Sequence, residues 1–251
     1  MPALPIPATD ELKLADWLEL LAVQSAARNA SLGDLERVLR RSSILEAHED
    51  QRSQEAIGEK LSQVARELKD RSRAAETGYP FTLEGSTLAW SGVEPRSVSY
   101  LFCLLLSIRF PELTKKKQTI SRRLFEDLSC VAAANYLGGR SLRFASPRSE
   151  LPRSFANAVT VLCSQLREGQ QYRDQPTLDS KDATLDVVAW KQFPDGLPSQ
   201  LVLFGQCASG NDWNSKLGTL RPRSFCEQWM FEVPPSEVLR GFFIPHRLLA
   251  A

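Results

Sequence analysis

The sequence has little histidine and no paired cysteine motif. Its 251 residues include two histidines, His48 and His246, and five cysteines, none of them in Cys-x-x-Cys spacing. A structural zinc site needs four closely spaced Cys or His ligands, so we do not expect one. The scattered, odd set of cysteines indicates reduced thiols, and we therefore expect a cytoplasmic protein.

Long apolar runs are also missing. No stretch approaches the roughly 18–20 apolar residues that span a bilayer. The N-terminus lacks the basic segment followed by an apolar one that marks a secretory signal. We therefore expect no contact with a membrane.

A large excess of charge of one sign is absent as well. The formal net charge is +1, and 43% hydrophobic with 24% charged residues is ordinary for a folded soluble protein. Residues 1–110 hold 13 basic against 16 acidic side chains, whereas residues 111–251 hold 18 against 14. This mild asymmetry favours contact of the second half with a polyanion.

The first half is predicted to be mainly helical. Leucines recur at helical spacing over residues 14–21, behind a cap at Thr9 or Asp10, and a charged helix with one apolar stripe is predicted over 53–75. Alternating residues over 81–90 predict a small β-hairpin. Residues 97–110 are apolar nearly all round, which predicts a buried helix.

A polar, basic connector over residues 111–123 separates the halves. We expect a helical regulatory or partner-binding domain over residues 1–112 and a second domain over 113–251. The second half reads helix, strand, helix, strand, strand, helix, strand, an order typical of an α/β fold with a mixed sheet.

Two strands of this sheet carry polar residues at one end. The runs LDVVAW (185–190) and QLVLFGQ (200–206) are continuously apolar, as in strands buried on both faces. Asp186 enters the first strand and Gln206 leaves the second, at similar distances from the turn between them. In an antiparallel hairpin these residues come close together. A carboxylate there is costly to bury unless a cation or hydrogen-bond donors compensate.

An acid on one strand, a short hairpin and a second strand ending in Asp/Glu/Gln-x-Lys is the pattern of the PD-(D/E)xK nucleases. The second half resembles this superfamily over roughly residues 120–250, in particular the Gln-x-Lys subset with Mrr-type restriction enzymes and anti-phage nucleases. The resemblance implies a restriction-endonuclease-like fold, a mixed central sheet flanked by helices. It also implies a DNA endonuclease that uses Mg²⁺ or Mn²⁺.

The resemblance implies roles for particular residues. Asp186 corresponds to the metal-binding acid and Gln206 to the second motif residue, and the main-chain carbonyl of Cys207 would be a further metal ligand. Glu126, in the segment LFEDL, corresponds to the glutamate of the helix that precedes the sheet. All-oxygen donor sets suit Mg²⁺, which lowers the pKa of a bound water for phosphodiester hydrolysis.

The sequence departs from the family at the motif lysine. Ala208 stands two residues after Gln206, where the family has lysine. Lys216, on the next predicted helix, is the expected replacement and would stabilise charge on the phosphate. Lys191 is a weaker substitute, because it lies five residues from Asp186 and therefore on the opposite face of the strand.

Basic residues near the predicted domain boundary are candidates for contact with the DNA backbone. They are Lys115, Lys116, Lys117, Arg122 and Arg123. The plainer interpretation of the three lysines is a solvated loop. Similarly, Asp186 and Gln206 also suit polar residues at strand ends, and Glu126 and Lys216 also suit solvated helix faces.

Three functions stay open from the sequence. The first is a nuclease effector of a prokaryotic defence system against phage or plasmids, with a protein partner or regulator from the same system and possible self-association. The second is a degenerate nuclease fold kept for nucleic-acid binding or as a scaffold in a multiprotein complex. The third is a partner-binding subunit without nucleic-acid contact, which uses the helix at 53–75.

Overall fold

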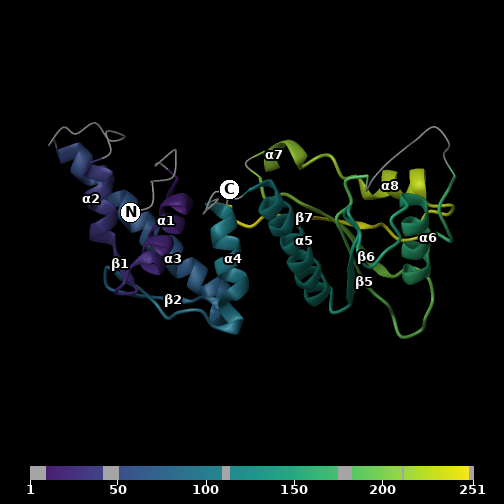
Figure 1. The fold of residues 1–251 in the computed structure, drawn as a ribbon, viewed down its shortest axis with the longest axis horizontal. Helices are drawn as coiled ribbons and strands as arrows, with labels where there is room; N and C mark the ends of the chain where they lie inside the picture. The colour runs from purple at the N-terminus through teal and green to yellow at the C-terminus, as the bar shows by residue number, and fades with distance from the viewer. Residues whose placement is uncertain (1–9, 42–50, 109–113, 175–182, 211, 249–251) are drawn as a thin grey trace. The chain divides into compact units, whose positions relative to one another are not determined.

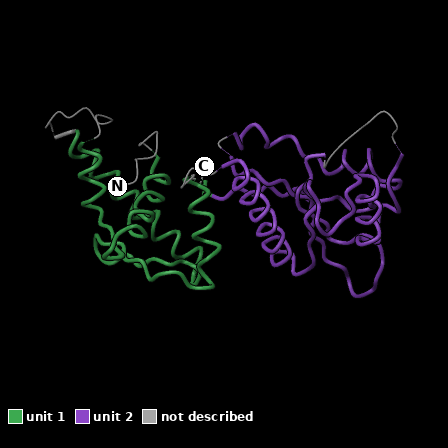
Figure 2. The backbone as a smooth tube through the Cα atoms, viewed as in Figure 1, with its two compact units in different colours: residues 1–113, 246–251 green, residues 114–245 purple. Residues whose placement is uncertain are grey.

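The computed structural model describes residues 10–41, 51–108, 114–174, 183–210 and 212–248 (Figure 1). The chain forms two compact units (Figure 2). Unit 1 comprises residues 1–113 together with 246–251, and unit 2 comprises residues 114–245. The division after residue 113 lies one residue from the boundary expected from the sequence. The last six residues, which we expected in the second domain, belong to unit 1.

Unit 1 combines helices with a small antiparallel sheet. The helices are α1 (Glu11–Gln24), α2 (Leu32–Arg41), α3 (Gln51–Ala75) and α4 (Val98–Ser107), with short 3-10 turns η1 (Glu76–Gly78) and η2 (Pro95–Ser97). The sheet has the order β1 (Asn29–Ser31), β3 (Thr87–Trp90), β2 (Phe81–Glu84). The predicted hairpin over 81–90 is confirmed, and β1 adds a strand that the sequence pattern did not reveal.

Local sequence accounts for the start of α1 and for the hairpin turn. The Asp10 carboxylate accepts a hydrogen bond of 2.9 Å from the Leu12 N–H, which caps α1 as predicted. Gly85 has a φ of 60° in the turn between β2 and β3, a conformation that glycine adopts without steric cost. The apolar faces of the helices then pack with the sheet in one core, which includes Leu14, Trp17, Leu18, Leu35, Val64, Leu68, Phe81 and Leu88.

Helix α4 is less buried than its composition predicts. In this helix only Leu104 is buried, whereas Val98 and Leu105 are 50% and 37% exposed. The expectation of a helix is confirmed and the expectation of burial all round is wrong. A helix that is apolar all round has no polar face to indicate which side meets the core, so its packing is decided by its neighbours.

Unit 2 is a mixed sheet covered by helices on both faces. Its elements are α5 (Lys115–Leu137), β4 (Arg140–Arg143), α6 (Phe155–Leu166), β5 (Val187–Lys191), β6 (Leu201–Cys207), α7 (Trp213–Lys216), α8 (Pro222–Trp229) and β7 (Leu239–Phe243). The sheet order is β4-β5-β6-β7; β6 and β7 are parallel and the other neighbours antiparallel. Helix α5 covers one face, and α6 and α8 cover the other (Figure 1).

The two central strands are buried on both faces, as their apolar runs predict. Val187 and Ala189 of β5 pack against α5, whereas Val188 and Trp190 pack against the layer of α6 and α8. Strand β6 alternates in the same way, with Leu203 towards α5 and Phe204 towards the other layer. This alternation sets which side chains near the ends of these strands face which helix layer.

Helix α5 begins earlier than expected. It starts at Lys115, so the basic stretch predicted as a connector is helical from that residue on. The helix ends at Leu137 and is capped by Gly138, whose φ of 64° is the left-handed conformation typical of a helix stop. None of the helices in the described residues has the length and apolar character needed to cross a membrane.

Candidate functional site

The hairpin of β5 and β6 brings Asp186 and Gln206 to the same end of the sheet. Val187 pairs with Gly205 at the last position of the β5–β6 ladder, so Asp186 directly precedes this pair and Gln206 directly follows it. The Asp186 N–H donates to the Gly205 carbonyl at 2.9 Å. A Cβ atom on Gly205 would lie 2.5 Å from the Phe243 ring, so glycine is needed for the close packing of β5, β6 and β7 beside this pair.

The Asp186 carboxylate joins the start of β5 to the end of β6. Its Oδ2 atom accepts a hydrogen bond of 2.8 Å from the Cys207 N–H, a charge-assisted contact. The Asp186 carbonyl accepts from the N–H groups of Phe144 and Ala145 at 2.7 and 3.2 Å. Asp186 is therefore held at its main chain by β6 and by the segment that follows β4.

Gln206 is buried, and its side chain has a different partner. Its Oε1 atom accepts a hydrogen bond of 2.9 Å from the Thr219 hydroxyl. The Thr219 N–H donates to the Lys216 carbonyl at 3.1 Å, so Thr219 links the end of α7 to the end of β6. The Asp186 carboxylate thus contacts the Cys207 N–H, whereas the Gln206 amide contacts a hydroxyl.

The Cys207 thiol lies on the α5 side of the sheet and is influenced by two acids. Burial raises its pKa well above the usual range, and the negative charges of Asp186 and Glu126 add to this increase. A hydrogen bond with Ser129 acts in the opposite direction. Asp186 and Glu126 are therefore near the same side chain, and the thiol is poorly suited to act as a nucleophile, because the reactive form is the thiolate.

Glu126 is engaged by an arginine that the sequence analysis missed. Arg143, a buried residue of β4, has its Nη1 atom 3.0 Å from Glu126 Oε2 and its Nε atom 3.2 Å from Asp127 Oδ1. Its guanidinium also donates to the carbonyls of Ala145 and Pro147. A buried guanidinium needs such partners, so Glu126 helps to hold α5 against β4. The signal was available: Arg143 is the only charged residue in SLRFASP.

The two lysines considered as replacements lie in different places. Lys216 ends α7 and its Nζ atom is 3.3 Å from Asp212 Oδ2, with its side chain partly exposed. Its carbonyl, rather than its ammonium group, is linked through Thr219 to Gln206. Lys191 pairs with Leu201 at the turn end of the hairpin, the end opposite Asp186.

The basic candidates for nucleic-acid contact all lie on the first half of α5. Each is exposed, namely Lys115, Lys116, Lys117, Arg122 and Arg123. Arg122 stands four residues before Glu126, so these two residues occupy neighbouring positions along the helix. Helix α5 thus carries both the exposed basic segment and Glu126, the residue that lies near Cys207.

Among the described residues, no cluster of three or more His, Cys, Asp or Glu side chains is suited to hold a metal. The candidate donors are of another kind: one carboxylate at Asp186, one amide oxygen at Gln206 and the main-chain carbonyl of Cys207. Mg²⁺ prefers oxygen ligands and usually keeps several waters, so this set fits it in chemistry. The Gln206 oxygen has two lone pairs and can accept from Thr219 while it binds a cation.

Comparison with known proteins adds no assignment. The chain matches no protein-family model, no curated protein and no solved structure.

Proposed function

We propose that unit 2 is a metal-dependent endonuclease of restriction-endonuclease-like fold, which hydrolyses DNA phosphodiester bonds with Mg²⁺ or Mn²⁺. The observation that carries this proposal is the end of the hairpin, where Asp186 and Gln206 flank the Val187–Gly205 pair and the Asp186 carboxylate accepts a hydrogen bond from the Cys207 N–H. A mixed four-stranded sheet with helices on both faces supports the fold.

In this proposal three groups hold the cation: the Asp186 carboxylate, the Gln206 amide oxygen and the Cys207 carbonyl. A bound Mg²⁺ polarises a phosphate and makes hydroxide available at neutral pH. The Cys207 N–H fixes one carboxylate oxygen of Asp186, and Thr219 fixes the Gln206 amide. Such contacts orient ligands before the cation arrives, which is the usual role of the groups around a metal site.

Lys216 and Glu126 have supporting roles in the same proposal. Lys216 exchanges its ion pair with Asp212 for the phosphate and stabilises charge there. The hydrogen bond from the Thr219 N–H to the Lys216 carbonyl holds the main chain of Lys216 near Thr219, whose hydroxyl contacts Gln206. Glu126, which is paired with Arg143, positions α5 beside Cys207 rather than serving as a free ligand.

The wider setting rests on the resemblance and on exposed charge. The basic first half of α5 contacts the DNA backbone in this proposal. Unit 1 serves for regulation or partner contact, and the protein acts as a cytoplasmic effector of anti-phage or anti-plasmid defence, with a regulator from the same system. Self-association would bring together two sites, one for each strand of the duplex.

Plasmid cleavage tests the nuclease. Asp186→Asn removes the ionised ligand while it keeps the shape of the side chain, and we expect at least about a 100-fold loss of Mg²⁺-dependent cleavage. Asp195→Asn is the matched control, since Asp195 lies in the turn of the same hairpin and accepts from the Leu197 N–H. Both variants are checked for folding by circular dichroism. Equal cleavage by wild type and Asp186→Asn would refute the proposal.

A degenerate nuclease fold is the second candidate, and particular observations favour it. Ala208 replaces the motif lysine, Lys216 is paired with Asp212, and Glu126 is paired with Arg143. This candidate predicts salt-sensitive DNA binding and no cleavage at any Mg²⁺ or Mn²⁺ concentration. A chain that neither cleaves nor binds DNA, yet forms a stoichiometric protein complex, would point to a partner-binding subunit.

A further inference from the structure

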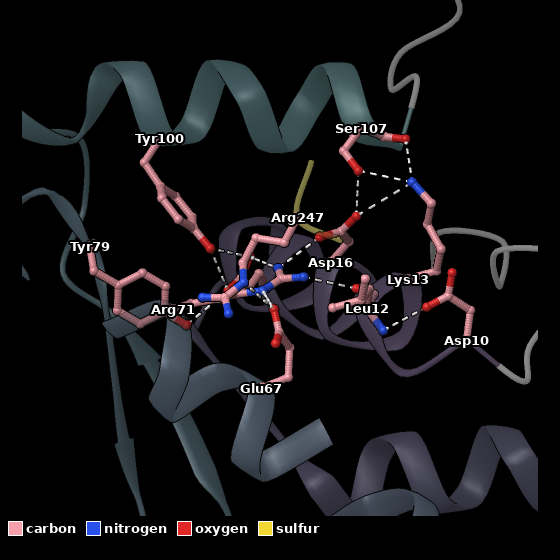
Figure 3. A network of polar contacts seen from close by, with 11 residues as sticks. Asp10, Leu12, Lys13, Asp16, Glu67, Arg71, Tyr79, Tyr100, Ser107 and Arg247 are labelled. Carbon is pink, nitrogen blue, oxygen red and sulfur yellow. Dashed lines mark hydrogen bonds and ion pairs between the residues drawn. The ribbon is translucent and has the colours of Figure 1, made fainter. Parts of the chain in front are cut away.

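Unit 1 buries a cluster of charged side chains between α1 and α3 (Figure 3). Arg71 of α3 is only 5% exposed, and its Nη1 atom lies 2.7 Å from Asp16 Oδ1 and 3.0 Å from Glu19 Oε2. Its Nε atom lies 2.7 Å from Glu67 Oε1, and its Nη2 atom donates to the Leu12 carbonyl at 3.0 Å. One guanidinium thus joins three carboxylates on two helices.

Two tyrosines complete the buried side of this cluster. The hydroxyls of Tyr79 and Tyr100 each donate to Glu19 Oε1 at 2.8 Å. Burial raises the pKa of both hydroxyls far above the usual range, and the charge of Glu19 adds to the increase, so both stay donors. The Ser107 hydroxyl, at the end of α4, donates to Asp16 Oδ2 at 2.5 Å. The cluster therefore ties α1, α3 and α4 together.

Two further basic side chains, Lys13 and Arg247, lie at the edge of the cluster, which we call its rim. Asp16, Glu19 and Glu67 are three buried carboxylates around a single buried guanidinium. The Lys13 Nζ atom lies 3.8 Å from Asp16 Oδ2, and the Arg247 Nε atom lies 3.3 Å from Glu67 Oε1. An incompletely paired buried carboxylate is strongly destabilising. Arg247, from the other end of the chain, thus contributes to the charge balance inside unit 1.

The segment that carries Arg247 continues directly from β7. Only Ile244, Pro245 and His246 stand between Phe243, the last residue of β7, and Arg247. His246 also lies near the cluster: burial lowers its pKa, the charge of Lys13 adds to this decrease, and Asp16 and Asp10 oppose it.

Strand β7 is in turn the neighbour of the strand that carries Gln206. Phe242 pairs with Gln206 and Phe243 with Cys207, and the Ala208 N–H donates to the Phe243 carbonyl at 2.8 Å. β7 is the last strand in the sheet order, and such edge strands open more readily than central ones. What holds the end of β7 therefore affects the backbone around Gln206.

We propose that residues 246–248 form a strap whose docking at Glu67 couples the buried charge cluster of unit 1 to the end of β7. When the strap is docked, Arg247 pairs with Glu67 and completes the charge balance there, and the C-terminal end of β7 is held in place. A partner that loosens unit 1 releases the strap and gives β7 more freedom beside Gln206. This device provides regulation by unit 1, and it does not require that unit 2 cleaves DNA.

Hydrogen exchange of the full chain, followed by mass spectrometry, tests the strap. Arg247→Glu sets a second carboxylate against Glu67, and we expect exchange over residues 239–248 to increase about tenfold, with β5 unchanged. Arg247→Lys keeps the charge and is expected to stay close to wild type. Arg223→Glu is the matched control, because Arg223 is paired with Glu227 and Glu237 on the exposed surface of unit 2.

Each outcome decides the proposal. Faster exchange in both the strap and β7 supports it. Faster exchange in residues 246–248 with unchanged β7 overturns the coupling, and no change in either segment overturns the strap itself. If Arg247→Glu unfolds unit 1 as a whole, Arg247→Gln is used instead, because it removes the charge without adding repulsion. The same comparison then decides the proposal, provided that α1 and α3 remain protected from exchange.

Discussion

Charged residues that contact a second element organise both units. In unit 2, Asp186 and Arg143 each stand out from an apolar stretch, and each reaches across to another element: Asp186 to the Cys207 N–H, and Arg143 to Glu126 on α5. In unit 1, Arg71 does the same for α1 and α3. Arg71 and Arg143 are buried, which makes their contacts expensive to leave unmade, so each of these residues decides how its neighbours are positioned.

Glu19 provides a pH-dependent test at this scale. Burial raises its pKa, and this outweighs the lowering by Arg71 and by the hydrogen bonds of Tyr79 and Tyr100; Asp16 adds to the increase. The folded state then binds more protons than the unfolded state between the ordinary pKa, 4.5, and the raised one. Stability therefore falls as pH rises through this window, by about 1.4 kcal/mol for each unit of pKa difference.

The variant Glu19→Gln cannot ionise and should lack this part of the pH dependence. Thermal unfolding of the wild type and of Glu19→Gln at a series of pH values from 4.5 upwards measures the effect. Hydrogen exchange in α1 reports the stability of unit 1 separately. We expect the stability of the wild type relative to Glu19→Gln to decrease as pH rises. A relative stability that increases with pH would contradict a raised pKa.

At the scale of elements, α5 has two distinct regions. Its apolar positions Cys130, Ala133 and Leu137 pack on the sheet, while its first half is exposed and basic. The helix pattern and the Gly138 stop were predictable from the sequence, because both are local. Its start was not, since a run of lysines is compatible with either a loop or a solvated helix and carries no apolar period.

Salt dependence tests the basic region of α5. Replacing Lys115, Lys116 and Lys117 together by glutamine removes up to three phosphate contacts, and each is expected to reduce the slope of log K against log salt by about 0.9. Fluorescence anisotropy with labelled duplex DNA measures this slope. The control is the double variant with Arg37→Gln and Arg40→Gln on α2. In the wild type, Arg37 is paired with Asp34 and Arg40 with Glu36. An unchanged slope in the lysine variant would remove this region from the DNA interface.

At the scale of the whole molecule, unit 2 is inserted between two parts of unit 1. The chain leaves unit 1 after residue 113 and returns to it at His246. The residues on both sides of unit 2 therefore belong to unit 1, so the strap proposed above is continuous in the chain with β7.

Deletion of residues 246–251 tests this organisation. The shortened chain loses Arg247 from Glu67 and His246 from the rim of the cluster, so unit 1 should lose stability while the central strand β5 of unit 2 stays protected. Hydrogen exchange in α1 and α3, compared with β5 and α6, measures the difference. Equal protection of α1 and α3 in both chains would show that the returning segment does not stabilise unit 1.

The sequence by itself determined the features that depend on near neighbours in the chain. The cap at Asp10, the hairpin over 81–90, the Gly138 stop and the two apolar strands of the β5–β6 hairpin follow from local propensity and periodicity. The location of Asp186 and Gln206 at the same end of the hairpin belongs with them, because a hairpin register is set by its own turn and pattern.

Only the tertiary structure decided the contacts between distant segments. The pairing of Glu126 with Arg143, the partial exposure of α4 and the return of Arg247 to Glu67 each require the fold to bring remote residues together. A charged side chain in the sequence reveals that it needs a partner when buried, but many oppositely charged residues can supply it. Which one does so depends on packing, since desolvation makes only the nearby groups effective.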